Sequence, residues 1–579
     1  MTVSSEYVLR PGEVVDLAHA VISNATRPSS DGEFVAISDG IRFESGVLGS
    51  GHVAIAELYG IPQYRDRALS SLFYLFDRQG KTQNDVTEEE PGRILHEERT
   101  LEMCGHLPAR QAAAARSYYH SLGAYWYNGD GSHRWRPEDG ILYFGSDENT
   151  LRTGKVAAAV LVSAYKEIQA RNLTGRGEYL AALGPFSDRL EAIRKGFEAV
   201  VSWDRWRTSQ SGIGLIVDKP MNPRALWPHS QWNSTGNLLH KDGSPMNVNG
   251  GHASLIVQGL SYDLSMSAAE VERAAGRSGA ELRAARFEKE AADKGSRVDE
   301  YFITSLDDGT PYAVPALGQD EHGAFVPQNL VTSDALETLS TGLWNRPGAE
   351  GIIPYVARLC LSIDFMTSGG IRLHANSTGR GGQEYIYTHG RHAVSLERNL
   401  RGVLGFCKQG YPGNALETFA RTCCLAETVS AVPNSVYFST KGSRLSAAKA
   451  DKTRIAVHSG EEYPRSHYVP AAAMIIRCSA QFEAQRTSGE SLLRVSDHEE
   501  PLLEQMPRPA PAPGTRRQFN PYAPRTAVDR QFPARPRRLA MEDPMPYLQE
   551  LDRGAVPYRM QLPPLSMVNT HFQLTSVSG

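Results

Sequence analysis

The sequence predicts an all-α fold in which helix pairs alternate with long loops, as in a helical toroid or solenoid. Two observations lead to this prediction. Apolar residues recur at helical spacing in many segments, and few stretches show the alternation typical of strands. No sequence repeat of fixed period is visible, which argues against a regular repeat array. In a toroid, functional groups are expected on the long loops at one end of the barrel.

Helices are expected from Val53 to Arg78, where Gly60-Ile61-Pro62 should divide the stretch into two. A polar, glycine-bearing turn is expected at Tyr143–Thr150. The other segments with helical periodicity are Ala109–Tyr127, Val156–Ala170, Tyr179–Trp206, Ala253–Leu264, Ala268–Lys294, Ser333–Leu343, Ala349–Phe365, Val394–Phe406 and Asn414–Ser430.

The chain has 579 residues and a formal net charge of -4, so neither nucleic acid nor an anionic membrane is favoured as a partner. No apolar run approaches the length of a membrane span, and the N-terminus lacks the pattern of a secretory signal. The six cysteines show no zinc-type spacing and lie mostly in apolar surroundings. Buried free thiols in a reducing compartment are expected, which predicts a cytoplasmic protein.

The composition changes after about residue 485, where arginine-rich pieces appear and 14 of the 34 prolines follow residue 500. We therefore divide the chain into an N-terminal segment (1–50), a helical domain (51–485) and an extended or disordered C-terminal arm (486–579). Aromatic residues punctuate the arm, so it is a candidate surface for a protein partner or for self-association. A disordered linker is the alternative interpretation.

One loop concentrates polar side chains that suit a sugar. The stretch EEEPGRILHE at residues 88–97 follows a helical segment, and its Pro-Gly pair predicts a sharp turn. The turn would let Glu90, Arg93, His96 and Glu97 converge. Carboxylates, a guanidinium and an imidazole together donate to and accept from the hydroxyls of a polyol. A solvated acidic loop is the alternative.

This stretch resembles the EEPGKILHE signature of bacterial amylo-α-1,6-glucosidase and glycogen-debranching-like proteins, which are six-hairpin (α/α)6 glycoside hydrolases. Further blocks follow in the same order. Residues 143–146 resemble the family's YYGTxDA loop, and residues 227–262 resemble NQGWKDSGD…ADG…ALxEVQGYAY, with Gln258 in the matching Val-Gln-Gly. Residues 370–372 and 387–390 resemble GIRT…YHNG, which includes His389. The resemblance touches roughly residues 45–440 and implies an (α/α)6 toroid that binds an oligosaccharide or polysaccharide.

The chain departs from the family where the chemistry is expected. The family's acid in Trp-Lys-Asp corresponds here to Ser234, preceded by Trp232 and Asn233. A serine hydroxyl is too weak an acid to protonate a glycosidic oxygen. The aspartate of YYGTxDA corresponds to Glu148, and the late LPEL glutamate has no carboxylate counterpart near Val432-Pro433-Asn434.

Glycoside hydrolysis needs two carboxyl groups, so other acids would have to replace them. Glu384, in a glycine-rich turn between family-like blocks, is the first candidate, and Asp242 is the second. For Asp242 a Lys-Asp-Gly turn, and for Glu397 a solvated Glu–Arg helix pair, are the alternatives. Trp232 lies in a polar loop where it can stack on a sugar. The sequence shows no metal-ligand spacing and no nucleotide motif, so neither a metal nor another cofactor is expected.

Two functions remain open from the sequence. The first is a glycoside hydrolase acting on an α-glucan or related oligosaccharide with relocated carboxylates. The second is a catalytically inactive descendant that serves as a sugar-binding, scaffold or structural assembly protein.

Deletion of residues 491–579 tests the proposed division of the chain. We expect the shortened protein to unfold in one cooperative thermal transition, because the helical domain should hold its own core. Circular dichroism at rising temperature measures this. Loss of the cooperative transition would show that the arm belongs to the domain.

Overall fold

The structure is a computed structural model of the 579-residue chain. It describes residues 11–28, 34–36, 47–84, 88–99, 141–171, 190–219, 251–305, 311–320, 322–328, 332–361, 365–367, 369–373, 393–429, 432, 435–437 and 468–487.

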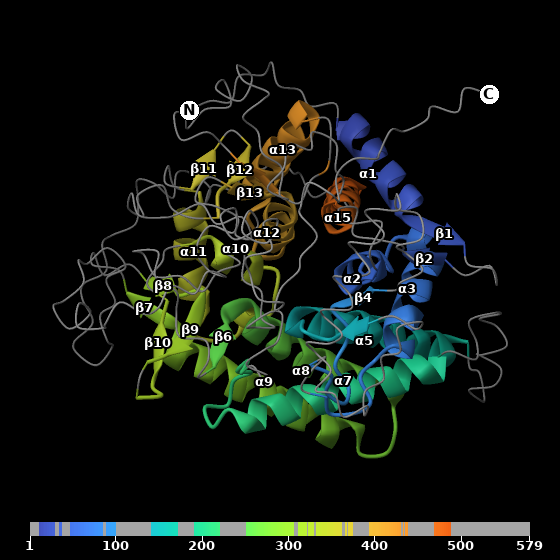
Figure 1. The fold of residues 1–579 in the computed structure, drawn as a ribbon, viewed down its shortest axis with the longest axis vertical. Coiled ribbons are helices and arrows are strands. Elements are labelled where there is room, and N and C mark those ends of the chain that lie inside the picture. The colour runs from blue at the N-terminus through green and yellow to red at the C-terminus, as the bar shows by residue number, and fades with distance from the viewer. Residues whose placement is uncertain are drawn as a thin grey trace, which may run out of the picture.

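The described chain is mostly helical, as the sequence predicts (Figure 1). The helices are α1 Pro11–Ala25, α2 Gly49–Ala56, α3 Arg65–Asp77, α5 Asp147–Ala170, α7 Leu190–Gln210, α8 Leu255–Ala275, α9 Ala280–Phe302, α10 Asp334–Thr338, α11 Ile353–Cys360, α12 Leu396–Lys408, α13 Pro412–Val429 and α15 Val469–Thr487.

Several helix boundaries differ from the prediction for identifiable reasons. Helix α5 begins at Asp147, inside the expected turn, because the Ser146 side chain accepts a hydrogen bond from Asn149 N and caps the helix. Helix α8 continues to Gly276, whose φ of 60° ends it, so the break before α9 falls later than expected. Helices α1 and α15 lie in segments where no helix was predicted, and the expected helix at Ala109–Tyr127 lies outside the described residues.

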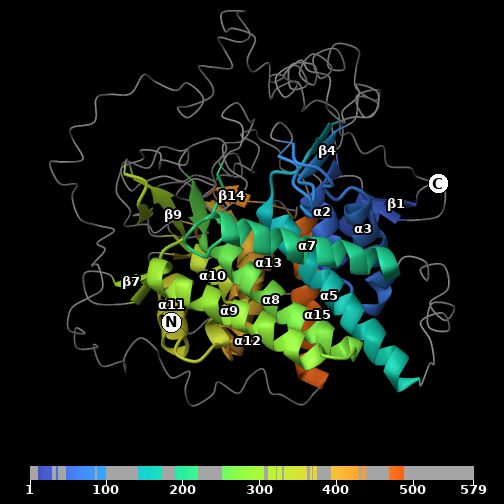
Figure 2. The same ribbon diagram turned by 90° about the horizontal axis from the view of Figure 1, so that it is seen from below.

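Short strands of two to four residues connect the helices in antiparallel pairs. In the turned view of Figure 2, β4, β9 and β14 lie on the upper side of the helices. The strands are β1 Thr26–Pro28 with β2 Phe34–Ala36, β3 Val47–Leu48 with β4 Glu97–Arg99 and β5 Ile141–Tyr143, β6 His252–Ser254 with β9 Ala316–Gln319 and β10 Phe325–Pro327, β7 Ile303–Ser305 with β8 Pro311–Ala313, β11 Met366–Thr367 with β12 Gly370–Ile371, and β13 Ala393–Ser395 with β14 Ser435–Tyr437.

Six helices contact one another in a closed circuit. Helix α2 contacts α5, α5 contacts α8, α8 contacts α10, α10 contacts α12, α12 contacts α15, and α15 returns to α2. Figure 1 shows these helices around a common centre, with α1, α3, α7, α9, α11 and α13 farther from it. Each outer helix packs on the circuit, for example α1 on α15, α9 on α8 and α13 on α12.

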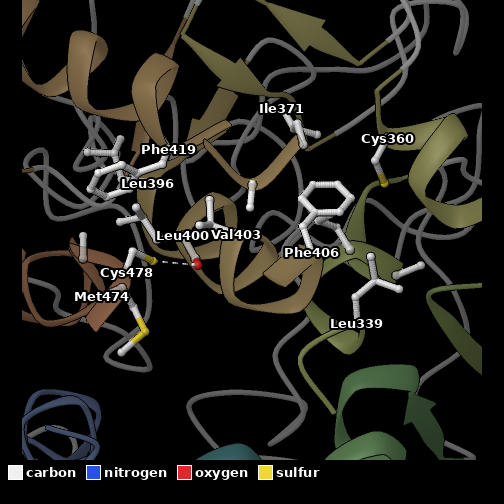
Figure 3. Close-up of a cluster of buried hydrophobic side chains, with 14 of the residues drawn as sticks. Leu339, Cys360, Ile371, Leu396, Leu400, Val403, Phe406, Phe419, Met474 and Cys478 are labelled. Atoms are coloured by element: carbon white, nitrogen blue, oxygen red, sulfur yellow. Dashed lines mark hydrogen bonds between the residues drawn. The ribbon is translucent and has the colours of Figure 1, made fainter. Parts of the chain in front are cut away.

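Helix α12 illustrates how the circuit is held together. Its apolar face packs between neighbouring elements, including Phe419 of α13, Leu339 beside α10 and Met474 of α15 (Figure 3). The Cys478 thiol donates to the Leu400 carbonyl over 3.3 Å. Cys360, Cys423 and Cys478 are free and buried, as the sequence predicts for cysteines in apolar surroundings, and burial raises the pKa of Cys360 to about 12.

The contact between α10 and α12 requires a glycine. A Cβ atom added at Gly402 would lie 2.5 Å from Leu336 Cγ, closer than side-chain atoms approach one another. This position therefore fixes the distance between the two helices.

A buried ion pair ties α7, α8 and α9 together. Lys294 Nζ donates to Asp204 Oδ2 over 2.6 Å, to Ser265 Oγ over 3.0 Å and to the Ser261 carbonyl over 3.2 Å. The Ser261 hydroxyl donates to Asp204 Oδ1 over 2.5 Å, so both carboxylate oxygens are satisfied.

The substitution Lys294→Met should lower the free energy of unfolding by about 3 kcal/mol, because Asp204 would stay buried without its cation. Urea denaturation at neutral pH measures the loss. Lys289→Met is the matched control on the same helix, since Lys289 pairs with Asp293 at the exposed surface and its removal should leave the unfolding midpoint unchanged. Equal effects of the two substitutions would contradict a stabilising role of the buried Lys294–Asp204 pair.

Candidate functional site

The acidic loop turns where the sequence predicts. Gly92 has a φ of 92°, and Arg93 N donates to the Glu90 carbonyl over 3.0 Å to close the turn. A Cβ atom at Gly92 would lie 2.2 Å from the Ala199 carbonyl oxygen of α7, so the loop packs directly on that helix.

Glu90 and Arg93 are inside the protein rather than at its surface, with 0% and 1% of their areas exposed. Glu90 Oε2 accepts from Trp203 Nε1 over 2.6 Å, and Glu90 Oε1 accepts from Arg207 Nη1 over 3.2 Å. Arg93 Nη2 donates to Asp147 Oδ1 over 2.6 Å, and its Nη1 donates to the Glu88 carbonyl over 3.0 Å. These hydrogen bonds all join the two side chains to protein groups, so they stabilise the loop.

These residues form a buried cluster that we call the base network. Arg207 extends it through Nη2, which donates to Asp218 Oδ1 over 3.2 Å and lies 3.7 Å from Asp147 Oδ2. Burial, and then the neighbouring carboxylates of Asp218 and Glu90, raise the pKa of Asp147, while both arginines oppose the change. The base network comprises Glu88, Glu90, Arg93, Asp147, Arg207 and Asp218.

Three further predicted site residues have different surroundings. Gln258 is buried and its side-chain amide pairs with the backbone of Ile216, accepting from N over 3.0 Å and donating to O over 2.9 Å. His96 is half-buried, and its carbonyl accepts from Gly49 N over 2.7 Å. Glu97 lies in β4, where its backbone pairs with Leu48 and Tyr143. Sugar contacts of Glu90, Arg93, His96, Glu97 and Gln258 stay predictions.

A second ion cluster lies inside the helix circuit, and we call it the central network. Glu337 of α10 accepts from Arg152 of α5 and from Arg398 of α12. Glu57, just after α2, lies 3.1 Å from Arg401 Nη2 and 3.6 Å from Arg152 Nη1. Two of these pairs, Glu337 with Arg152 and Glu57 with Arg401, join helices that are not neighbours in the circuit, so the side chains extend into the space that the six helices enclose. The members are Glu57, Glu148, Arg152, Glu337, Glu397, Arg398, Arg401 and Arg477.

The predicted site residue Glu148 lies at one end of this network, in the first turn of α5. Its Oε2 is 3.7 Å from Arg152 Nη2, and its Oε1 is 3.7 Å from Arg398 Nη2. Glu148 Oε1 is buried and accepts no hydrogen bond from any residue that the structure describes. Glu397 in the first turn of α12 pairs with Arg401 over 2.9 Å, as in the helix pair considered as its alternative role, but the two side chains are 18% and 5% exposed, so the pair is not a solvated one.

Neighbouring arginines determine the ionisation of Glu57. Burial alone would raise the pKa of Glu57, but Arg401, Arg477 and Arg152 together lower it to about 2. Burial lowers the pKa of Arg401, and Glu57 and Glu397 raise it by more, so this arginine stays charged. Glu57 is therefore an anion throughout the neutral range and cannot serve as a general acid there.

Several predicted site residues lie outside the described part of the chain: Trp232, Asn233, Ser234, Asp242, Glu384 and His389. Among the residues that the structure does describe, no group of three or more His, Cys, Asp or Glu side chains is arranged to hold a metal ion. No described helix is long and apolar enough to cross a membrane.

The sequence interpretation missed the arginine partners of both networks. Trp203 and Arg207 lie four residues apart on α7, so their spacing indicates a shared face, but nothing in the sequence shows that Glu90 lies against it. Local signals for the central network were present in the i, i+4 spacings of Glu148 with Arg152 and of Glu397 with Arg401.

Comparison with known proteins found no described family and no curated protein that matches the sequence. Solved structures with a related chain path include a GH63 mannosylglycerate hydrolase from Thermus thermophilus in complex with glucose, at 12% identity and a TM-score of 0.44 over 80% of this chain and 99% of that one. A protein described as wild-type glycosidase follows at 13% identity and a TM-score of 0.41, over 83% and 99% of the two chains. An uncharacterized conserved protein, also from Thermus thermophilus, gives 13% identity and a TM-score of 0.43, over 80% and 99%. Similarity at this level decides neither the family nor the activity of the chain.

Glu57→Gln should cost more stability at pH 7 than at pH 3. Because the folded-state pKa of Glu57 is about 2, below the ordinary 4.5, its ionisation stabilises the fold above pH 4.5. That contribution, about 3 kcal/mol, is lost as the pH falls from 4.5 to 2. Urea denaturation of both proteins at pH 7 and pH 3 measures the difference.

Glu417→Gln provides the control, since Glu417 pairs with Arg421 on the more exposed face of α13 and should change stability little at either pH. A Glu57→Gln deficit that is the same at both pH values would contradict the lowered pKa.

Proposed function

We propose that the chain is a carbohydrate-active protein with an (α/α)6 toroid fold, and that it hydrolyses an α-glucan or related oligosaccharide. The closed helix circuit supports the fold proposal. Along the chain an outer helix precedes each circuit helix, in the order α1–α2, α3–α5, α7–α8, α9–α10, α11–α12 and α13–α15. Six such hairpins constitute an (α/α)6 toroid.

The central network is the observation that carries the functional proposal. It brings carboxylates and guanidinium groups together inside the circuit, where Glu148 and Arg398 from the first turns of α5 and α12 approach one another. Such groups both accept from and donate to sugar hydroxyls. Four of the eight charged side chains, those of Glu148, Arg152, Glu337 and Arg401, are buried. Burying them is costly compared with an apolar core, which suggests that their polarity has a use.

Hydrolysis itself is assigned to Glu384 and Asp242, the candidates for the acid pair. Mass spectrometry of products from a panel of α- and β-linked oligosaccharides is the direct test. We expect the wild-type protein to release monosaccharide and Glu384→Gln or Asp242→Asn to be slower by about 100-fold or more. Unchanged release by both variants would mean that other residues perform the chemistry.

A non-hydrolytic sugar-binding or scaffold role is the second candidate, and a specific observation favours it. Every described carboxylate of the central network lies within 4 Å of an arginine, and the pKa of Glu57 is about 2. A general acid requires the opposite environment, which raises its pKa. Binding without turnover in the same panel would establish this role, with the C-terminal arm as the candidate surface for assembly.

Under either role, Glu148→Gln should weaken sugar binding by about tenfold or more, because a charged hydrogen-bond acceptor is replaced by a neutral amide. Isothermal titration with the best-bound oligosaccharide measures the affinity. Glu167→Gln on the same helix is the control, since Glu167 pairs with Arg171 at the helix end and should bind as the wild type does. Equal affinities of wild type and Glu148→Gln would remove Glu148 from the site.

A further inference from the structure

The two ends of the segment 219–251 meet at a short antiparallel bridge. Asp218 and His252 exchange backbone hydrogen bonds of 2.8 Å in both directions, and His252 Nδ1 lies 3.8 Å from Asp218 Oδ2. Both residues are buried, with 2% and 0% of their areas exposed. Asp218 and His252, which form the base of this segment, are therefore fixed inside the protein. The segment itself contains the predicted residues Trp232 to Asp242.

The base of the segment 100–140 is fixed in a similar way. Strand β4 before the segment pairs with β5 after it. Just beyond these strands, Arg93 Nη2 donates to Asp147 Oδ1 over 2.6 Å, and Ile94 N donates to Thr150 Oγ1 over 3.0 Å. Side chains on both flanks of this segment thus hold its ends together.

Arg207 joins the two bases. Its Nη1 donates to Glu90 Oε1 over 3.2 Å on the side of the segment 100–140, and its Nη2 donates to Asp218 Oδ1 over 3.2 Å on the side of the segment 219–251. Nη2 also lies 3.7 Å from Asp147 Oδ2. The side chain is 8% exposed, so these attractions act with little screening by water.

The charge count makes Arg207 hard to replace. Among the described residues, the base network contains four carboxylates, Glu88, Glu90, Asp147 and Asp218, and two guanidinium groups. Without Arg207, Asp218 would lose the described guanidinium group 3.2 Å from its carboxylate, and Glu90 would keep Arg93 at 3.9 Å. Repulsion among the remaining carboxylates would then favour separation of the two bases.

We propose that Arg207 is a positioning residue that couples the base of the segment 100–140 to the base of the segment 219–251. A positioning role for sugar contacts on these segments rests on the proposed function. The coupling of the two bases does not, because it follows from the contacts of Arg207 alone.

Limited trypsin digestion of the full chain, with cleavage at each site followed by mass spectrometry, tests the coupling. In Arg207→Met we expect cleavage to accelerate by about tenfold or more in both segments, because local opening limits proteolysis. The informative sites are Arg110, Arg116 and Arg134 in the first segment and Arg224 and Lys241 in the second. Reference sites outside both segments, Arg380 and Lys441, should be cleaved at the wild-type rate.

Two outcomes would overturn the proposal. Faster cleavage in the segment 219–251 alone would make Arg207 a local anchor, and equal acceleration at every site would indicate global destabilisation. Arg205→Met is the matched control, since Arg205 lies on the same helix but pairs with Glu290 at the surface, and its cleavage pattern should equal that of the wild type.

A second variant keeps the test decisive if Arg207→Met does not fold. Arg207→Lys keeps a positive charge beside Glu90 and Asp218 but cannot supply two separate donor nitrogens in a fixed geometry, so the protein should fold with the two bases joined less tightly. The same sites in both segments should still be cleaved faster than in the wild type, by a smaller factor. Acceleration confined to Arg224 and Lys241 would again overturn the coupling. Sugar affinity of the same variants bears only on the proposed function.

Discussion

The need to pair charges away from water governs this structure. Inside the helix circuit, four carboxylates and four guanidinium groups belong to one cluster, and its pairs connect α2, α5, α10, α12 and α15. An unpaired charge buried there would destabilise the fold by more free energy than a complete pair contributes. Each helix must therefore have the shift along its axis and the rotation about it that bring its charged residue to a partner. The apolar clusters around the circuit supply the driving force, and the central network restricts how the helices can align.

The base network applies the same constraint to loops. Glu90, Asp147 and Asp218 come from three separate parts of the chain, and Arg207 of α7 contacts all three. Glu90 and Arg93, which the sequence analysis placed in a sugar-binding loop, are therefore buried residues that bind other protein groups. The hydrogen bonds from Trp203, Arg207 and Arg93 explain how a turn with several acids can be buried.

Local features were predictable because their causes are local. The sharp turn at Gly92, the division between α2 and α3 and the helical periodicity of α12 follow from glycine, proline and apolar spacing. The partners of Glu90 were not predictable, since Trp203 and Arg207 lie 113 and 117 residues away. Helix α15 was missed because it lies far beyond the last family-like block, and its packing against α1 depends on contacts across the whole chain.

The candidate site residues also divide into those that a local sequence pattern explains and those that depend on distant contacts. Glu148 was proposed from a sequence block and lies in the first turn of α5, beside Arg398, whereas the burial of Gln258 reflects a backbone contact with Ile216 that no local pattern reveals. Glu57 inside the circuit is not suited to proton donation at neutral pH, because its neighbouring arginines lower its pKa to about 2. In the proposed hydrolase the acid pair stays assigned to Glu384 and Asp242, which lie outside the described residues.

Hydrogen–deuterium exchange with and without a bound oligosaccharide is the sharpest test of a ligand site inside the circuit. If the end of the central network binds the sugar, the first turns of α5 and α12, around Glu148 and Arg398, should exchange more slowly when the sugar is present, while α9 and α13 remain unchanged. Protection confined to the outer helices, or none at these two turns at saturating sugar, would contradict a site at this position.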